Sequence, residues 1–406
     1  MKPRRLAAQV AAITAARGGL NTGYRMVYLF LPALARGLQV EPQAIIQAVA
    51  ARSALGLGAA LLGSLADLRG RRTVMVAGTA IFAAGCLLLT IWPSYTTFYL
   101  AMLAVALSKI LFDPAALAYL GDRVAYERRG LVLGVGELAW SGSILLGVPA
   151  AGWLMDRAGW KAPFPWLAVY SLVAGAWMAH QLAPDSQAGG AQNSMRSGLR
   201  TVLASGSALA LLAVGLLLTA ANEAVGIVLG LWLESSFQLQ LAALGAASAV
   251  IGAAELGGEG LVAGLVDRLG KRRSVALGIL GSSLSALALP ALGRTLGGGL
   301  LGVFLYYLIF EFTIVASLPL MTEQVPQARA TLLAVNIAGF SLGRSLGAMV
   351  GGPLYGVGLF ANAGAAAALN LVAMLVLLFF VRDRPSQAET GALGLPAGAR
   401  PSAPQE

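Results

Sequence analysis

Long apolar stretches alternate with short polar turns along almost the whole chain. An α-helix needs about 20 consecutive apolar residues to cross the hydrocarbon core of a bilayer. Twelve stretches approach that length, at residues 8–35, 44–66, 73–92, 96–120, 131–154, 164–182, 202–232, 240–266, 274–293, 299–321, 331–356 and 362–381. The pattern therefore predicts an all-α integral membrane protein with twelve transmembrane helices.

The turns between these stretches differ in their content of basic residues. Most Lys and Arg follow the second, fourth, sixth, eighth and tenth stretches, whereas the opposite turns hold only Arg36, Arg157, Lys161 and Arg294. Because cytoplasmic loops of membrane proteins are enriched in Lys and Arg, the asymmetry predicts that both termini are cytoplasmic. It also accounts for the net charge of +10 without a nucleic-acid partner.

One charged turn occurs in both halves of the chain. GSLADLRGRR at 63–72 returns as GLVDRLGKRR at 264–273, and a second pair of similar segments lies at 119–134 and 319–335. A repeated turn between apolar helices predicts two pseudo-symmetric six-helix bundles. The expected parts are an N-terminal bundle at 1–182, a cytoplasmic linker at 183–200, a C-terminal bundle at 201–382 and a disordered cytoplasmic tail at 383–406.

The composition supports lipid as the main solvent and excludes several chemistries. Hydrophobic residues make up 58% of the chain and charged residues 11%, whereas soluble domains carry about 25% charged residues. The single Cys86 and the single His180 offer no disulfide and no metal cluster. There is no phosphate-binding loop for nucleotides and no Ser–His arrangement. We therefore expect a protein that is not an enzyme, holds no cofactor or metal, and depends on an ion or solute gradient.

Ionisable residues lie in the middle of several predicted spans. A charge at that depth is costly, so it usually faces a cavity or a partner and serves function. Burial also disfavours the ionised form of a carboxyl group, which suits a group that must bind and release protons. The central cavity that we predict for substrate and proton coupling is lined by Tyr24, Arg25, Tyr28, Lys109, Asp113, Glu137, Trp140, Glu223, Glu311 and Arg344.

Structural alternatives exist for these charges. Lys109 and Asp113 are four residues apart and share a helix face, so they form either a proton-linked pair or a self-neutralising pair. Arg25 shares a face with Asn21, Tyr24 and Tyr28. As a permanent cation, it would hold a carboxylate or an anionic substrate group. The carboxylates could instead form buried salt bridges with Arg25 or Arg344.

Four further charges are placed outside this predicted cavity. Glu255 and Glu259 fall nearer the cytoplasmic turn, and as like charges on one face they repel each other unless a proton or a cation intervenes. Arg17 is nearer the cytoplasmic end of the first span, where its side chain could extend to the membrane surface. Arg52 is mid-span but receives no role.

The turn at 63–72 resembles the signature of the major facilitator superfamily, in which Leu68 replaces the usual arginine. SKILFDPAALAYLGD in the fourth span is similar to the second signature of that family, with Lys109 at the arginine position. LGVPAAG at 146–152 is similar to the Gly-Pro motif of the antiporter branch, with Val148 inserted between glycine and proline. The resemblance covers nearly the whole chain and is nearest to the twelve-span drug:proton antiporters.

The resemblance implies alternating access, in which two bundles rock about a central cavity. The repeated turn would then act as a cytoplasmic gate, with Asp67 pairing with a helix N-terminus or with Arg123. Alternatively, its arginines only fix the topology. The gate residues that we predict are Gly63, Asp67, Gly70, Arg71, Arg72, Arg123, Asp267 and Gly270.

These observations predict a secondary active transporter of the inner membrane. The function expected first is proton-coupled export of a small amphipathic or organic molecule. One alternative is uptake or facilitated transport of a nutrient such as a sugar, an amino acid or an organic anion. Another is a lipid translocase or a membrane component that transports nothing. The expected partners are a small-molecule substrate, protons and membrane lipids, without nucleic acid, and the chain is expected to act as a monomer.

Overall fold

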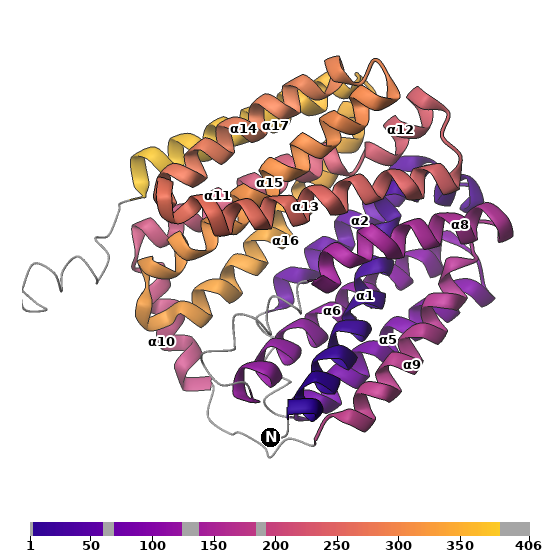
Figure 1. Cartoon of the computed structure of the whole chain (residues 1–406), viewed down its shortest axis with the longest axis horizontal. Helices are drawn as coiled ribbons and strands as arrows, with labels where there is room; N and C mark the ends of the chain where they lie inside the picture. The colour runs from indigo at the N-terminus through magenta and orange to yellow at the C-terminus, as the bar shows by residue number, and fades with distance from the viewer. Residues whose placement is uncertain (1–2, 60–68, 124–137, 184–191, 382–406) are drawn as a thin grey trace, which may run out of the picture.

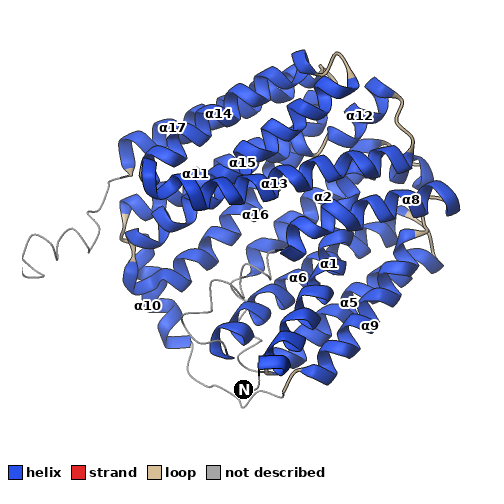
Figure 2. Cartoon of the chain, viewed as in Figure 1, coloured by secondary structure: helices blue, strands red, loops and turns tan. Residues whose placement is uncertain are grey.

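A computed structural model of the chain describes residues 3–59, 69–123, 138–183 and 192–381. Within these ranges every regular element is a helix (Figure 2). The first half contains α1 (Pro3–Leu38), α2 (Pro42–Leu55), α5 (Arg71–Ile91), α6 (Tyr95–Arg123), α8 (Val148–Ala158) and α9 (Pro163–Gln181). The second half contains α10 (Gln192–Leu203), α11 (Gly206–Gly226), α12 (Leu229–Phe237), α13 (Leu241–Leu269), α14 (Lys271–Leu292), α15 (Leu296–Gln324), α16 (Arg329–Tyr355) and α17 (Leu359–Phe380).

The predicted apolar stretches coincide with these helices over most of their described residues. Within the described parts of the chain, nine helices are long and apolar enough to cross a membrane. The predicted all-α membrane class is thus supported, while the count of twelve spans stays a prediction. The C-terminal part of the predicted linker forms the helix α10, and the predicted tail lies outside the described residues.

Several predicted spans contain interruptions that the apolar pattern does not show. The stretch at 202–232 includes the last residues of α10, which ends at Leu203, the whole of α11 and the start of α12. A break separates the end of α11 at Gly226 from the start of α12 at Leu229. A side chain at Gly230 would meet the carbonyl oxygens of Tyr28 and Leu29 on α1. The break therefore accompanies a close crossing of α12 over α1, which only glycine permits at this point.

The two halves of the chain form two helix groups that lie side by side (Figure 1). In the first half, α5 packs against both α6 and α9, and α1 packs against α9. In the second half, α11 packs against α16 and α17, and α15 packs against α13 and α14. The groups meet mainly through α8 with α13, α2 with α16 and α1 with α12.

Several close contacts between the halves lie toward one end of the molecule, which we name the closed end. Gly152 of α8 lies against the Leu241 carbonyl and Gly245 of α13, and Gly352 of α16 lies against Gln43 of α2. Toward the opposite end, where α10 and the N-terminus lie, the ribbons of the two halves draw apart (Figure 1). We name this opposite side the linker end.

The fifth predicted span contains a π-helical turn at Ser143–Gly147, where it meets α13. In a π-helix the carbonyl of residue i bonds the N–H of residue i+5, and the Val148 N–H does bond the Ser143 carbonyl. The next carbonyl, that of Ile144, would need an N–H from Pro149, which has none. Ser248 of α13 reaches it instead, with its hydroxyl 2.9 Å from the Ile144 carbonyl oxygen. The opposite half thus satisfies a backbone group that the fifth span leaves without a partner.

We expect Gly152→Ala to destabilise the closed end. The added Cβ would lie 2.6 Å from the Leu241 carbonyl oxygen and 3.0 Å from Gly245 Cα, and overpacking of this kind costs about 1–3 kcal/mol. The midpoint of thermal unfolding in detergent should fall.

Gly264→Ala in α13 is the matched control, because a Cβ there meets nothing within 4 Å. Both variants gain about 1 kcal/mol of helix propensity when glycine is replaced by alanine, so the comparison cancels that gain. Equal midpoints for the two variants would contradict a tight contact at Gly152.

The repeated turn has the same backbone conformation in both halves. Gly70 precedes α5 with φ of 86° and Gly270 precedes α14 with φ of 84°, a region that favours glycine. The helices that follow are also similar in length, with 21 residues in α5 and 22 in α14. These features agree with the predicted repeat, and the pseudo-symmetry of the two bundles stays a prediction.

Candidate functional site

An ion pair between Arg25 of α1 and Glu255 of α13 links the two halves. Both nitrogens of the Arg25 fork donate to Glu255, with Nη1 2.8 Å from Oε2. The Arg25 guanidinium also lies 4.3 Å from the centroid of the Trp140 ring. Only 6% of Arg25 and 3% of Glu255 are exposed, so the two charges compensate each other inside the protein. Glu255, which the sequence analysis leaves outside the predicted cavity, thus pairs with a residue of that cavity.

A second cluster lies within the first half, between α1 and α6. Lys109 Nζ is 2.9 Å from one oxygen of Asp113, as their spacing predicts, and Arg17 Nε is 3.1 Å from the other. Lys109 also donates to Asn21, whose amide nitrogen donates to the Ala139 carbonyl at 3.1 Å. The Arg17 side chain is thus held inside the protein instead of extending to the membrane surface. Two cations thus share the Asp113 carboxylate.

A third group surrounds Arg52 of α2, which is only 1% exposed. Its guanidinium donates to the Tyr24 carbonyl at 2.6 Å and to the Tyr28 hydroxyl at 3.0 Å. It also lies 3.7 Å from the centroid of the Tyr24 ring. Among the described residues no carboxylate bonds to Arg52. The tyrosines predicted as cavity lining therefore solvate a buried cation in this conformation.

Glu223 of α11 and Arg344 of α16 approach this third group from the second half. Glu223 is 3% exposed and interacts with the Tyr28 hydroxyl and with the charges of Arg344 and Arg52. Its Oε1 has no hydrogen-bond partner among the described residues. Arg344 in turn faces Tyr24 and Tyr28. The structure thus brings these four predicted site residues together.

Glu311 of α15 stands apart from the paired carboxylates. It is 9% exposed and makes no hydrogen bond or ion pair with any other described residue. Its electrostatic neighbours are Glu255, Glu259, Arg25 and Arg344. Glu137 lies outside the described residues, so its predicted role stays a prediction.

The predicted gate is only partly covered by the described residues, since Gly63 and Asp67 lie outside them. Arg71 donates to the Ala118 carbonyl at 2.8 Å and Arg72 to the Ala179 carbonyl at 2.5 Å, in the last turns of α6 and α9. Positive charge is favourable at helix C-termini. These two contacts agree with a structural role for the arginines.

Arg123 and Asp267 are the remaining charged gate residues in the described part of the chain. The Arg123 guanidinium lies 3.7 Å from the centroid of the Tyr119 ring. Asp267 is exposed and makes no hydrogen bond or ion pair with a described residue. An ion pair that the sequence did not predict joins Lys271 to Glu323 nearby. A latch at Asp67 or Asp267 stays a prediction.

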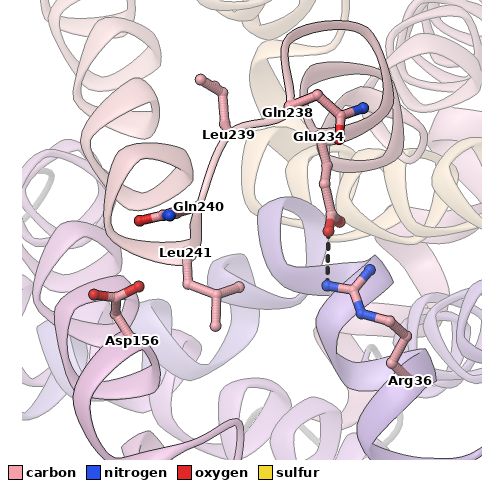
Figure 3. A pocket seen from close by; sticks show the side chains of 7 residues that line it. All are labelled: Arg36, Asp156, Glu234, Gln238, Leu239, Gln240 and Leu241. Atoms are coloured by element: carbon pink, nitrogen blue, oxygen red, sulfur yellow. Dashed lines mark ion pairs between the residues drawn. The ribbon is translucent and has the colours of Figure 1, made fainter.

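A pocket of about 320 Å³ opens at the closed end, between α1, α8 and the turn from α12 to α13 (Figure 3). Arg36 Nη2 pairs there with Glu234 Oε1 at 2.7 Å, and Asp156 lies on the opposite wall. The ion pair joins the two halves, but the Arg36 side chain is 62% exposed. Exposed pairs contribute little to stability. Because the walls of the pocket come from both halves, we regard it as part of the contact between the halves at the closed end.

Sequence reasoning identified most of the central charges but missed some of their partners. Four further residues belong to the central groups, and each is a polar residue within an apolar stretch: Arg17, Asn21, Arg52 and Glu255. Among the described residues, no group of three or more His, Cys, Asp or Glu side chains could hold a metal ion.

Comparison with known proteins gives consistent results. A sequence model described as Major Facilitator Superfamily matches residues 18–348 and, in a second match, 211–403. The Escherichia coli (strain K12) inner membrane transport protein YdhP is 26% identical over 364 residues, covering 89% of this chain and 92% of that protein. YceJ, an uncharacterized MFS-type transporter of Bacillus subtilis (strain 168), is 26% identical over 318 residues, covering 75% and 78%.

Other matches are shorter or concern the fold alone. YwfA, an uncharacterized MFS-type transporter of Bacillus subtilis (strain 168), is 32% identical over 108 residues, and the match spans only 26% of that protein. The crystal structure of the POT family transporter PepTSo has a TM-score of 0.74 at 14% identity, covering 94% of this chain and 99% of that one. Such a likeness supports the helical architecture and carries no information about substrate.

Proposed function

Because this chain belongs to the major facilitator superfamily, we propose that it is a secondary active transporter that works by alternating access in the inner membrane. The proposed activity is export of a small amphipathic or organic molecule in exchange for protons. In the proposed orientation the linker end faces the cytoplasm, as the distribution of basic residues predicts.

The observation that carries this proposal is the buried Arg25–Glu255 ion pair between α1 and α13. Its two members belong to different halves, so any motion that separates α1 from α13 at this depth must break the pair. A proton on Glu255 would remove the negative charge and weaken the attraction to Arg25. Proton binding would thereby be coupled to the relative position of the halves.

The coupling can be tested in inverted membrane vesicles that contain the overproduced protein. We expect vesicles energised with a proton gradient to accumulate an exported substrate, and a protonophore to reduce the initial rate at least about tenfold. Glu255→Gln should remove the dependence on the gradient, because glutamine cannot be ionised. Accumulation that survives collapse of the gradient in the unmodified protein would disprove proton coupling.

The Arg17, Lys109 and Asp113 cluster favours uptake or facilitated passage of an organic anion as a second candidate function. The Lys109 ammonium in this cluster could donate to a carboxylate or phosphate group of the substrate. Counterflow in proteoliposomes that hold organic anions would distinguish this activity from proton-driven export, because counterflow needs no proton gradient.

A further inference from the structure

A short helix that does not cross the membrane, α10, begins the second half at the linker end (Figure 1). It ends at Leu203, and α11 begins at Gly206. Three residues of chain span about 11 Å at most. Because α11 begins one of the helices that are apolar enough to cross a membrane, the last turn of α10 lies close to the level at which the chain enters the membrane.

One face of α10 packs against the protein. Gly198 and Val202, four residues apart, are both buried. A Cβ at Gly198 would lie 2.3 Å from the Thr331 hydroxyl oxygen, and Thr331 begins the apolar part of α16. Val202 belongs to the same apolar cluster as Ala208 of α11 and Leu332 of α16. The helix is therefore held against the beginnings of two membrane-length helices, at the boundary between lipid and water.

The rest of the α10 surface changes in character around the helix. With about 3.6 residues per turn, Leu199 and Leu203 follow the buried face, and they are 40% and 57% exposed. Arg200 comes next, and beyond it lie Ser197 and Thr201, all three of them exposed. An apolar face that borders a basic and then a hydroxyl-bearing face is typical of a helix that lies in the membrane interface.

Exposed basic residues lie on α10 and beside it. The helix contains no acidic residue. The short helix η3 (Pro326–Ala328) contacts α10 and leads directly to Arg329, which is exposed at the start of α16. Neither Arg200 nor Arg329 forms an ion pair with another described residue. Guanidinium groups pair with phosphate through parallel N–H donors, so the charge around α10 is complementary to acidic lipid headgroups.

We propose that α10 is an interfacial helix that binds acidic phospholipids of the adjoining leaflet. Leu199 and Leu203 lie among the acyl chains, while Arg200 and Arg329 bind the headgroups. Lipid fits this surface better than a soluble partner does, because the two leucines lie at the level where lipid surrounds the protein. The bound lipid holds the beginning of the second half at the membrane surface. This surface is separate from the central site and does not depend on the transported molecule.

The contact can be measured with a fluorescent label on the full chain in phosphatidylcholine vesicles. Leu203→Cys provides the attachment site, since the single native cysteine, Cys86, is buried. Lipid with brominated acyl chains quenches a label that lies among those chains. Thr201→Cys is the matched control, because it lies on nearly the opposite side of the same helix, which is about 10 Å wide, and we expect quenching there to be at least about twofold weaker. Equal quenching of the two labels would overturn the proposal.

Two lipid mixtures then test the charge. The brominated lipid is a minor component of the vesicle, either as phosphatidylglycerol or as phosphatidylcholine. We expect the anionic lipid to be enriched beside the Leu203→Cys label at least about fivefold, the effect of one arginine close to an acidic membrane surface. Equal quenching by the two lipids would refute binding of acidic headgroups.

Charge variants of the labelled chain locate the headgroup site. Arg200→Gln should remove most of the preference for phosphatidylglycerol and keep the quenching by phosphatidylcholine, because the leucine face is unchanged. Arg273→Gln is the matched control, since Arg273 is another exposed arginine, in the first turn of α14, and it should leave the preference intact. An equal loss in both variants would indicate only the general charge of the surface, and the proposed site would be wrong.

A second reporter guards against a variant that fails to fold. Leu199→Cys places the label on the same face one helical turn earlier, and thermal unfolding confirms that each labelled chain is folded. No quenching at either leucine position would mean that α10 lies away from the bilayer, with its arginines open to a soluble anion or protein, which would also refute the proposal. None of these measurements depends on transport, so they succeed or fail independently of the proposed function.

Discussion

Glu255→Ala is expected to destabilise the protein by about 3–5 kcal/mol, the usual consequence of leaving one member of a buried ion pair alone. Arg25 would keep its full charge, because a guanidinium stays protonated, and its 6% exposure offers little access to water. The remaining contact to the Trp140 carbonyl, at 3.2 Å, cannot neutralise it. Thermal unfolding in detergent should show a clearly lower midpoint, and transport should be lost.

The control for this experiment removes both charges. Arg25→Met with Glu255→Met replaces the pair by apolar side chains, which often costs little or even stabilises a protein. We expect the double variant to recover most of the stability but not the transport, since the coupling group is gone. The four proteins form a double-mutant cycle. Single-variant losses that simply add up in the double variant would show that the pair has no net interaction.

The second large effect is expected for Asp113→Asn, which changes the charge cluster between α1 and α6 and should lower the rate of transport. Asp113 bonds to both Arg17 and Lys109, and its removal takes away a negative charge that offsets the repulsion between these two cations. Their side chains are 13% and 14% exposed, so water screens this repulsion weakly. We expect the rate of transport to fall at least about a hundredfold, which corresponds to about 3 kcal/mol.

Lys109→Met tests whether the loss of the Asp113 charge explains the slower transport, or whether any substitution in this region would slow it. It removes one cation and leaves the ion pair between Arg17 and Asp113 in place, at 3.1 Å. Initial rates in proteoliposomes should therefore fall much less for Lys109→Met than for Asp113→Asn. Equal losses would mean that Lys109 has a role of its own, and that the charge balance of the cluster does not explain the effect.

The sequence predicted the helices well because an apolar stretch of membrane length leaves the backbone few alternatives to a helix. It did not predict the π-helical turn at Ser143–Gly147 or the break between α11 and α12. Both depend on residues far away in the chain, Ser248 on α13 for the first and the α1 carbonyls under Gly230 for the second. A local pattern contains no information on such partners.

The candidate site was predicted unevenly for a related reason. The Lys109–Asp113 pair follows from helical spacing alone, and the structure forms it. Glu255 was recognised as a charge within an apolar span but was not included in the predicted cavity. In the structure it lies in the middle of α13, whose 29 residues run from Leu241 to Leu269. Which cation meets which carboxylate depends on how the two halves pack, and the apolar periodicity of each helix does not determine that packing.

The Ser248 hydroxyl has a single hydrogen to donate, and this affects the contact between the two halves. Two carbonyl oxygens compete for it, Gly245 at 2.6 Å on its own helix and Ile144 at 2.9 Å on the facing one. If α13 withdraws, serine keeps the Gly245 bond, whereas Ile144 loses its donor because proline cannot provide one. Parting the halves here must therefore either hydrate that oxygen or rewind the fifth span into a regular α-helix. Because only the Ile144 carbonyl loses its donor, this contact favours the conformation in which α13 and the fifth span are joined.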